Sequence, residues 1–335
     1  MSMLKQWRSL LIKLTGSALI LWLLFRFVDI DLKALGKQLE HLNLLKYLIS
    51  LSGVILVLAV KSYRWHLLIR TEGVFYPVRH SFGAYMASYT IGIITPGRIG
   101  EIARLYYVRQ YADMKFIPAF RTIITDRIFD LGVLVMMAIG GLLYFGPWPV
   151  KNMYIAVIAG VLLFFVGLFM ANWFFKYLIR LARFKQQGLL VFLTETIRPA
   201  IISQSVKLWL ITVLAYLIFY GAIALILDAM SIHLGLIDIA IIISVVGLVT
   251  ILPVSWAGFG TREVTLVYLL GLYGIPAEAA LSFSLLQFTA FFLWGSLVGL
   301  VFWLLMPVSI KQIRQDSKNL WIWLQKREPN TAHKK

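Results

Sequence analysis

Long apolar runs, separated by short polar or basic intervals, dominate this chain of 335 residues. A helix rises about 1.5 Å per residue, so a run of about 20 apolar residues crosses a hydrocarbon core of about 30 Å. Runs of about this length occupy residues 10–28, 42–60, 123–145, 153–171, 208–227 and 280–305. The pattern predicts an all-α polytopic membrane protein with about six full spans.

Two further apolar runs, residues 81–111 and 237–273, are interrupted by Pro, Gly and charged residues at 95–104 and 253–263. The part of each run that follows its interruption is too short to cross the membrane. Proline and glycine end helices, so each interruption predicts a turn of the chain. We therefore expect two re-entrant hairpins, with turns at Pro96, Gly97 and Gly100 in the first and at Pro253, Gly258 and Gly260 in the second.

Basic residues predict the orientation, because Lys and Arg accumulate in cytoplasmic segments. They flank the first hairpin on both sides, whereas the flanks of the second, residues 228–236 and 274–278, contain none. The hairpins should therefore enter from opposite faces, with both chain termini in the cytoplasm. The two runs also share an order of Pro, Gly-rich turn, Glu and Ile-Pro-Ala, which indicates an inverted repeat. We expect one transmembrane domain, 1–310, and a basic cytoplasmic tail, 311–335.

Composition supports a membrane protein, since 60% of the residues are hydrophobic and the mean hydropathy is +0.83. The formal net charge of +17 would suggest nucleic acid for a soluble protein, but its distribution here indicates topology and contact with anionic lipids. We therefore expect membrane lipids as partners and no nucleic acid. Without cysteine, and with five scattered His residues, the chain has no pattern typical of a metal site, and no cofactor is predicted.

Charged residues in the two interruptions and at the start of the run 123–145 predict a substrate site. The second half of each hairpin would begin inside the membrane, where helix N-termini and Arg side chains bind anions such as a lipid phosphate. Charges at membrane depth are usually functional. The predicted substrate-binding residues are Arg98, Glu101, Arg104, Arg121, Asp126, Arg127, Asp130, Ser255, Arg262 and Glu263.

Each of these charges also has a structural interpretation. Glu101 and Glu263 could complement helix dipoles, and the aspartates at 126 and 130 with the arginine between them could form a structural ion cluster. Arg104 and Arg121 could also serve only to keep the segment after the first hairpin on the cytoplasmic side of the membrane, as basic residues do.

Three motifs carry a resemblance to a known family. They are Pro-Gly-Arg-Ile-Gly-Glu-Ile-Ala-Arg at 96–104, Thr-Asp-Arg-Ile-Phe-Asp at 125–130 and Pro-Val-Ser-Trp-Ala-Gly-Phe-Gly-Thr-Arg-Glu at 253–263. In this order and spacing the chain resembles the lysylphosphatidylglycerol synthase transmembrane-domain family of flippase-like proteins, which includes the membrane half of multiple peptide resistance factors. The resemblance implies a lipid-flipping fold with paired re-entrant helices. Unlike the best-understood members, the chain has no soluble synthase or glycosyltransferase domain.

These observations favour a lipid flippase or transporter in the cytoplasmic membrane of a bacterium or archaeon. It would move an anionic or phosphate-linked lipid through a cavity between the hairpins. No catalytic residues are predicted, so we expect no enzyme activity. A membrane transferase acting on lipid-linked sugars or aminoacyl groups, and a non-transporting partner of a soluble synthase, stay open as alternatives. The lipid, the direction of transport and homodimer formation are also open.

Overall fold

The computed structural model of the chain describes residues 36, 40–94, 96–145, 152–167, 206–251 and 258–306, with the side chains of residues 94–99 left undescribed. Every regular element in these ranges is a helix, which confirms the predicted all-α class. Four of the helices are long and apolar enough to cross a membrane. The chain is therefore built as a multi-pass membrane protein.

The four candidate spans are α3 (Leu44–Thr71), α6 (Phe116–Phe145), α9 (Val206–Ala229) and a continuous span made of α12 (Ala277–Phe288), the π-helical η2 (Thr289–Trp294) and α13 (Gly295–Leu305). The predicted span at 10–28 lies outside the described residues. The predicted span at 153–171 is described as far as 167, as the shorter apolar helix Met153–Gly167. The predicted count of six full spans therefore stays a prediction.

The second predicted span, 42–60, was assigned the wrong end. Helix α3 continues through Lys61, Arg64 and Arg70 to Thr71, so residues expected on a cytoplasmic flank are helical. The side chain of Arg64 is fully buried. A basic residue can remain inside a span when buried carboxylates compensate its charge.

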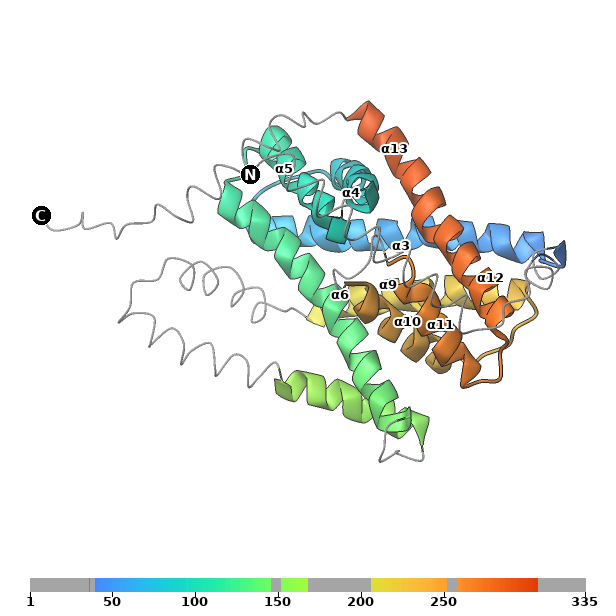
Figure 1. The fold of residues 1–335 in the computed structure, drawn as a ribbon. Coiled ribbons are helices and arrows are strands. Elements are labelled where there is room, and N and C mark those ends of the chain that lie inside the picture. The colour runs from blue at the N-terminus through green and yellow to red at the C-terminus, as the bar shows by residue number, and fades with distance from the viewer. Residues whose placement is uncertain are drawn as a thin grey trace, which may run out of the picture.

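Helices α3 and α9 pack against each other in opposite directions. The N–H of Asn43, before α3, donates to the carbonyl oxygen of Ala229, the last residue of α9, at 2.8 Å. Near the other end, Arg64 donates to Thr212 at 3.0 Å. Between these points Gly53 lies against Ala222, where a side chain would not fit. Figure 1 shows the pair running side by side through the centre of the molecule.

The first interrupted run comprises α4 (Val78–Ile94), the 3-10 helix η1 (Pro96–Ala103) and α5 (Arg104–Ala112). After Pro96 the chain turns back, so that the side chain and backbone of Glu101 lie against Gly92. The rings of His80, near the start of α4, and Tyr111, near the end of α5, are 6.0 Å apart. Both ends of the run therefore lie close together.

The second interrupted run comprises α10 (Leu236–Ile251) and α11 (Thr261–Gly271). Gly258 has a φ of +81°, which favours glycine, and a β-carbon at this position would lie only 2.8 Å from the side chain of Thr250. At the other end of the run, the Tyr273 hydroxyl donates to Asp238 Oδ1 at 2.6 Å. This run also reverses direction and brings its two ends together.

The helix ends define two faces of the bundle. Phe145, at the end of α6, has its ring 5.9 Å from that of Tyr273, which precedes α12. At the opposite ends of the same two spans, the Tyr107 hydroxyl of α5 donates to the Met306 carbonyl at 2.9 Å, and α5 packs against α6. We call the face at the end of α6 and the start of α12 the Tyr273 face. The opposite face, at the start of α6, is the Arg121 face, because Arg121 lies in the first turns of α6. The first interrupted run has its ends on the Arg121 face, and the second on the Tyr273 face.

Long-range packing links the two halves of the chain. Helix α4 of the first interrupted run packs against α13, and α10 of the second run packs against α6. In Figure 1, α6 and the span of α12 and α13 both cross the α3/α9 pair obliquely. One large apolar core joins these helices, from Val54 of α3 through Met86 of α4 to Ile226 of α9 and Phe283 of α12.

Candidate functional site

Seven charged side chains meet where α3, α6 and the junction of η1 with α5 pack together. Four are basic and three are acidic, so the group has one excess positive charge when all are ionised. Its members are Lys61, Arg64, Glu101, Arg104, Asp126, Arg127 and Asp130. We call this group the charged cluster.

Arg64 and Asp126 form the centre of the charged cluster. Arg64 donates from Nε and Nη2 to Asp126 Oδ1 at 2.9 and 2.6 Å, and from Nη2 to Asp130 Oδ1 at 2.9 Å. Its Nη1 donates to Thr212 Oγ1 at 3.0 Å. Lys61 Nζ lies 3.1 Å from Asp130 Oδ1. These bonds tie α3 to α6 and α9 through planar, charge-assisted contacts, which are the strong class of hydrogen bond.

The first interrupted run supplies the other side of the charged cluster. Arg104 Nη1 lies 2.8 Å from Asp126 Oδ2. Arg104 Nη2 forms a longer ion pair of 3.5 Å with Glu101 Oε2, and Arg127 Nη2 also pairs with Glu101 Oε2. The Arg104 guanidinium also packs 4.4 Å from the centre of the Tyr85 ring. A cation over an aromatic face is stabilised by the ring quadrupole. The turn after Pro96 thus places a carboxylate and a cation directly against α6.

Arg127 is the most exposed member of the charged cluster. The side chains of Arg64, Arg104 and Asp126 are 0% exposed, whereas that of Arg127 is 37% exposed. Arg127 Nε has no hydrogen-bond partner among the described residues. Asp126 is ten residues into α6, about 15 Å along the helix from the Arg121 face. The charged cluster is therefore inside the span and still accessible, mainly at Arg127.

A second, smaller group surrounds Arg262 at the start of α11. Arg262 Nε donates to Glu263 Oε1 at 3.0 Å and to Ser284 Oγ of α12 at 2.9 Å. Glu263 Oε2 accepts from the Gly260 N–H at 2.7 Å, which satisfies a backbone donor at the start of α11. We call Arg262, Glu263 and Ser284 the Arg262 group. Its one cation and one carboxylate balance in charge.

Aromatic rings enclose the Arg262 guanidinium. The centres of the Phe259, Phe288 and Phe292 rings lie 5.5, 5.2 and 5.8 Å from its central carbon. Arg262 Nη1 is buried and has no hydrogen-bond partner among the described residues. Ser284 is seven residues into α12, about 10 Å along the helix from the Tyr273 face. The Arg262 group and the charged cluster therefore lie nearer to opposite faces.

The structure brings together five of the predicted site residues, Glu101, Arg104, Asp126, Arg127 and Asp130, in the charged cluster, and two more, Arg262 and Glu263, in the Arg262 group. Arg121 pairs instead with Glu72, at 3.3 Å from both carboxylate oxygens. The Arg98 side chain, Pro253 and Ser255 lie outside the described residues. Pro96, Gly97 and Gly100 belong to η1, and Gly258 and Gly260 form the turn before α11.

Lys61 and Arg64 are the two members of the charged cluster that sequence reasoning missed. Both were assigned to a basic flank, although they follow the helical spacing of the buried positions Ser50, Val54 and Val57. An Arg that falls on the buried face of a continuing helix must meet a carboxylate. This helical spacing, which places Arg64 on the buried face of α3, was the signal that could have identified it.

Comparison with known proteins gives a consistent result. A family described as the lysylphosphatidylglycerol synthase TM region matches residues 10–299. A UPF0104 membrane protein of Methanocaldococcus jannaschii is 22% identical over 330 residues, covering 89% of this chain and 97% of the relative. A UPF0104 membrane protein of Methanothermobacter thermautotrophicus is 28% identical over 124 residues, covering 35% of this chain and 37% of the relative. No solved structure matches.

Proposed function

This chain belongs to the lysylphosphatidylglycerol synthase TM region family, and on that premise we propose that it moves an anionic or phosphate-linked lipid between the leaflets of a membrane. The membrane would be the cytoplasmic membrane of a bacterium or archaeon. The protein acts as a transporter, without enzyme activity of its own. The charged cluster binds the lipid headgroup, and Arg127 is the side chain that first contacts it.

The observation that carries this proposal is the excess positive charge of a cluster buried within a membrane-spanning helix bundle. Ion pairs that serve only to hold helices together are best balanced, because each unpaired charge in hydrocarbon is costly. Among the described residues one cation is in excess, and the partly exposed Arg127 has a buried Nε without a hydrogen-bond partner there. A phosphate would supply both the missing negative charge and the missing acceptor, and Arg is suited to bind it bidentately.

The arrangement of the helices supports an inverted repeat. Its halves would be α3 to α6 and α9 to α13, in which α3 and α9 run antiparallel and each interrupted run packs on the last span of the other half. Both interrupted runs reverse direction, one from each face. Interrupted helices of this kind, in halves of opposite orientation, line the substrate sites of many transporters. In the membrane the two runs are re-entrant hairpins.

The charged cluster and the Arg262 group provide two positions at which a lipid headgroup can bind as it crosses the membrane. The charged cluster is about 15 Å from one end of α6, and the Arg262 group about 10 Å from the opposite face along α12. Arg262 Nη1 is a buried donor with no partner in the described structure, so it can also bind an anion. The headgroup passes between them while the lipid tails stay in the hydrocarbon.

Charge distribution orients the protein. Arg70, Arg79, Arg109 and Lys115 lie at the ends of helices on the Arg121 face, in or beside α3, α4, α5 and α6. Because Lys and Arg are retained on the cytoplasmic side, this face is cytoplasmic, as are both chain termini. The charged cluster is then nearest to the cytoplasmic leaflet.

Transport in reconstituted vesicles tests the proposal. Purified protein in phosphatidylcholine vesicles with a trace of fluorescent phosphatidylglycerol should make the inner-leaflet label accessible to an impermeant quencher faster than empty vesicles do. The substitution Arg127→Ala removes a charge-assisted contact of about 1.5–3 kcal/mol, so the rate should fall roughly 10- to 100-fold. Glu101 keeps its contact with Arg104, so folding should be preserved.

Arg79→Ala is the matched control, because Arg79 is an exposed arginine on α4 outside both polar groups. It should transport at the wild-type rate. A polyprenyl phosphate is tested in the same way as a second substrate. If the wild type accelerates neither lipid, or if Arg127→Ala transports both as well as Arg79→Ala does, the proposal is wrong.

A further inference from the structure

The last candidate span contains a π-helical segment, η2, between α12 and α13. In a π-helix the backbone hydrogen bonds join residues five apart rather than four, so the turn is wider and holds an additional residue. Such segments are rare and frequently lie at functional sites. They are also among the few places where a helix kinks sharply. The segment η2 is therefore the place where this span can bend.

Hydroxyl groups of two neighbouring helices bind backbone carbonyls at η2. The Tyr47 hydroxyl of α3 donates to the Leu286 carbonyl at 3.2 Å, just before the segment. The Tyr89 hydroxyl of α4 donates to the Phe291 carbonyl, inside the segment, at 2.6 Å. Side chains of adjacent helices commonly satisfy backbone groups that an irregular turn frees in a membrane. Because these donors are side chains, they can be released without unwinding either helix.

Helix α13, after η2, is attached to the first interrupted run. Gly295 and Gly299 are four residues apart on α13, a spacing of small residues that allows two helices to approach closely in a membrane. Gly299 lies so close to the Met86 carbonyl of α4 that a side chain would not fit. At the end of α13, the Met306 carbonyl accepts from the Tyr107 hydroxyl of α5 at 2.9 Å. These contacts join α13 to both α4 and α5.

Helix α12, before η2, is attached to the second interrupted run. Ser284 of α12 accepts from Arg262 Nε at 2.9 Å, and the Phe288 ring lies 5.2 Å from the central carbon of the same guanidinium. Helix α12 also packs against α11 and α9. The first interrupted run, by contrast, supplies Glu101 and Arg104 to the charged cluster. The segment η2 thus separates a part of the span fixed to the Arg262 group from a part fixed to the charged cluster.

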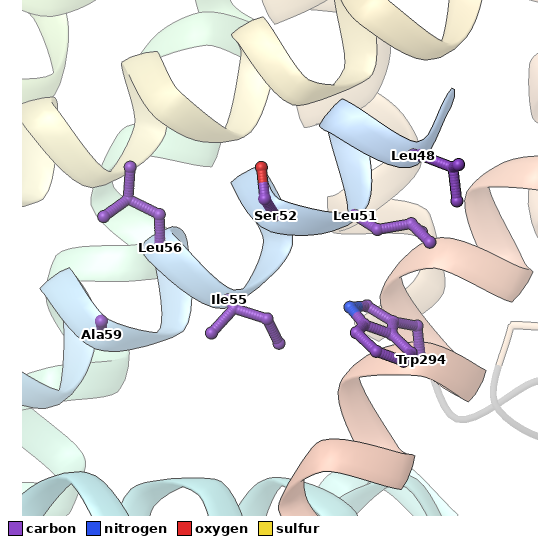
Figure 2. Close-up of a pocket in the computed structure, with 7 residues that line it drawn as sticks. All are labelled: Leu48, Leu51, Ser52, Ile55, Leu56, Ala59 and Trp294. Atoms are coloured by element: carbon purple, nitrogen blue, oxygen red, sulfur yellow. The ribbon is translucent and has the colours of Figure 1, made fainter. Parts of the chain in front are cut away.

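An apolar groove beside η2 leaves room for the segment to move. The groove lies between Trp294, at the end of η2, and the stretch of α3 from Leu48 to Ala59, and its volume is about 680 Å³. Figure 2 shows the indole of Trp294 reaching toward α3 beside Leu51 and Ile55. Lipid tails are as apolar as the groove, so they can enter or leave it at little cost when Trp294 moves.

We propose that η2 is a hinge, at which α13 and the first interrupted run move as one body against α12 and the second interrupted run. A change of about 20° in the kink would shift the far end of α13, about 16 Å from η2, by about 6 Å. The motion changes the separation of the two headgroup positions, and such rocking of one part against another underlies alternating access. Its purpose rests on the proposed function, whereas the motion itself is measurable without a transport assay.

Distances between nitroxide labels test the hinge, because the chain contains no cysteine and two can be introduced freely. The labels are placed at Leu217→Cys on α9 and Leu304→Cys on α13, and distances are recorded by electron paramagnetic resonance in nanodiscs with and without phosphatidylglycerol. Two distances, about 6 Å apart, are expected. Leu217→Cys with Leu285→Cys on α12 is the matched control and should give one distance. All three leucines are exposed on the bundle, so labels fit there.

Removing the wide turn tests the role of η2 itself. Leu293 is exposed within η2, and its deletion removes the additional residue, so that α12 and α13 continue as one α-helix. The pair at 217 and 304 should then give one distance, and lipid transport should fall to the rate of empty vesicles. If this deletion prevents folding, Tyr89→Phe replaces it, because losing one carbonyl contact should change the proportion of the two distances.

The results separate the hinge from the proposed function. A single distance for the pair at 217 and 304 in the full chain would overturn the hinge, even if lipid is transported. Two distances in the control pair would place the motion elsewhere than η2, and two distances that persist after deletion of Leu293 would do the same. Two distances in the full chain without transport of any lipid would leave the hinge standing and overturn the proposed function.

Discussion

Replacing Arg64 tests whether the charged cluster holds the bundle together as its geometry implies. Arg64 donates to Asp126, Asp130 and Thr212, and its side chain is 0% exposed. In Arg64→Leu, Asp126 keeps the contact of Oδ2 with Arg104 and a longer ion pair with Arg127, and it loses all three of its hydrogen bonds to Arg64. Removing one partner of a buried ion pair costs about 3–5 kcal/mol, because the other charge stays buried. We expect the free energy of unfolding to fall by this amount.

The assay is equilibrium unfolding in mixed micelles, followed by tryptophan fluorescence, because Trp65 packs 5.3 Å from the Arg104 guanidinium and reports on the cluster. Arg121→Leu is the control, since its partner is Glu72 and it is 27% exposed, and it should lose at most about 1 kcal/mol. Adding Asp126→Leu to Arg64→Leu should cost less than the two single losses together. If Arg64→Leu unfolds like Arg121→Leu, the cluster does not stabilise the bundle.

Three further predictions follow from close contacts and from the Arg262 group. Gly299→Ala should lower the free energy of unfolding by about 1–3 kcal/mol, because a β-carbon there would collide with the carbonyl oxygen of Met86. Gly271 has open space around it, so Gly271→Ala should leave the free energy of unfolding unchanged or raise it slightly in the same assay. Gly258→Ala should cost about 1–2 kcal/mol because φ is +81°, and an unchanged melting temperature would contradict this. Arg262→Gln should slow lipid transport while preserving the folded state, measured by the vesicle assay and by unfolding side by side; loss of folding with transport per folded molecule unchanged would contradict a binding role.

Helix positions could be predicted well from the sequence wherever apolar runs end at clear signals. The run 208–227 corresponds to α9, Val206–Ala229, and the interruption at Pro96 separates α4 from η1. Boundaries marked only by basic residues were less certain. Lys61 and Arg64 suggest the end of a span, but α3 continues for seven more residues after Arg64, because carboxylates on α6 compensate the charge.

Partners within the candidate site were beyond the reach of the sequence. Asp126 and Asp130 were identified as one group by their spacing of four, yet their principal partner, Arg64, is 62 residues away from Asp126. Such pairing depends on how α3 and α6 cross, which local patterns do not encode. The Arg262 pair was simpler, since its carboxylate is the next residue, Glu263, and the helix start positions both.

The proposed inverted repeat rests on a shared order of short motifs, and the structure adds contacts between its two proposed halves, α3 to α6 and α9 to α13. Helix α4 packs on α13 and α10 on α6, and these contacts involve apolar residues without a distinctive sequence. The two polar groups also differ in a way that their motifs do not show. The charged cluster has a net positive charge and contacts the long helices α3, α6 and α9. The Arg262 group has no net charge, and phenylalanine rings surround its guanidinium.

The most direct test of the central claim is to locate the lipid headgroup. We propose an experimental structure of the protein in lipid nanodiscs that contain phosphatidylglycerol, at a resolution that defines phosphate groups. Phosphate density within hydrogen-bonding distance of the Arg127 guanidinium is the result expected if the charged cluster is a headgroup site. If Arg127 contacts only carboxylates, and every phosphate lies at the membrane surface, the charged cluster is a structural ion network and the proposed lipid site is wrong.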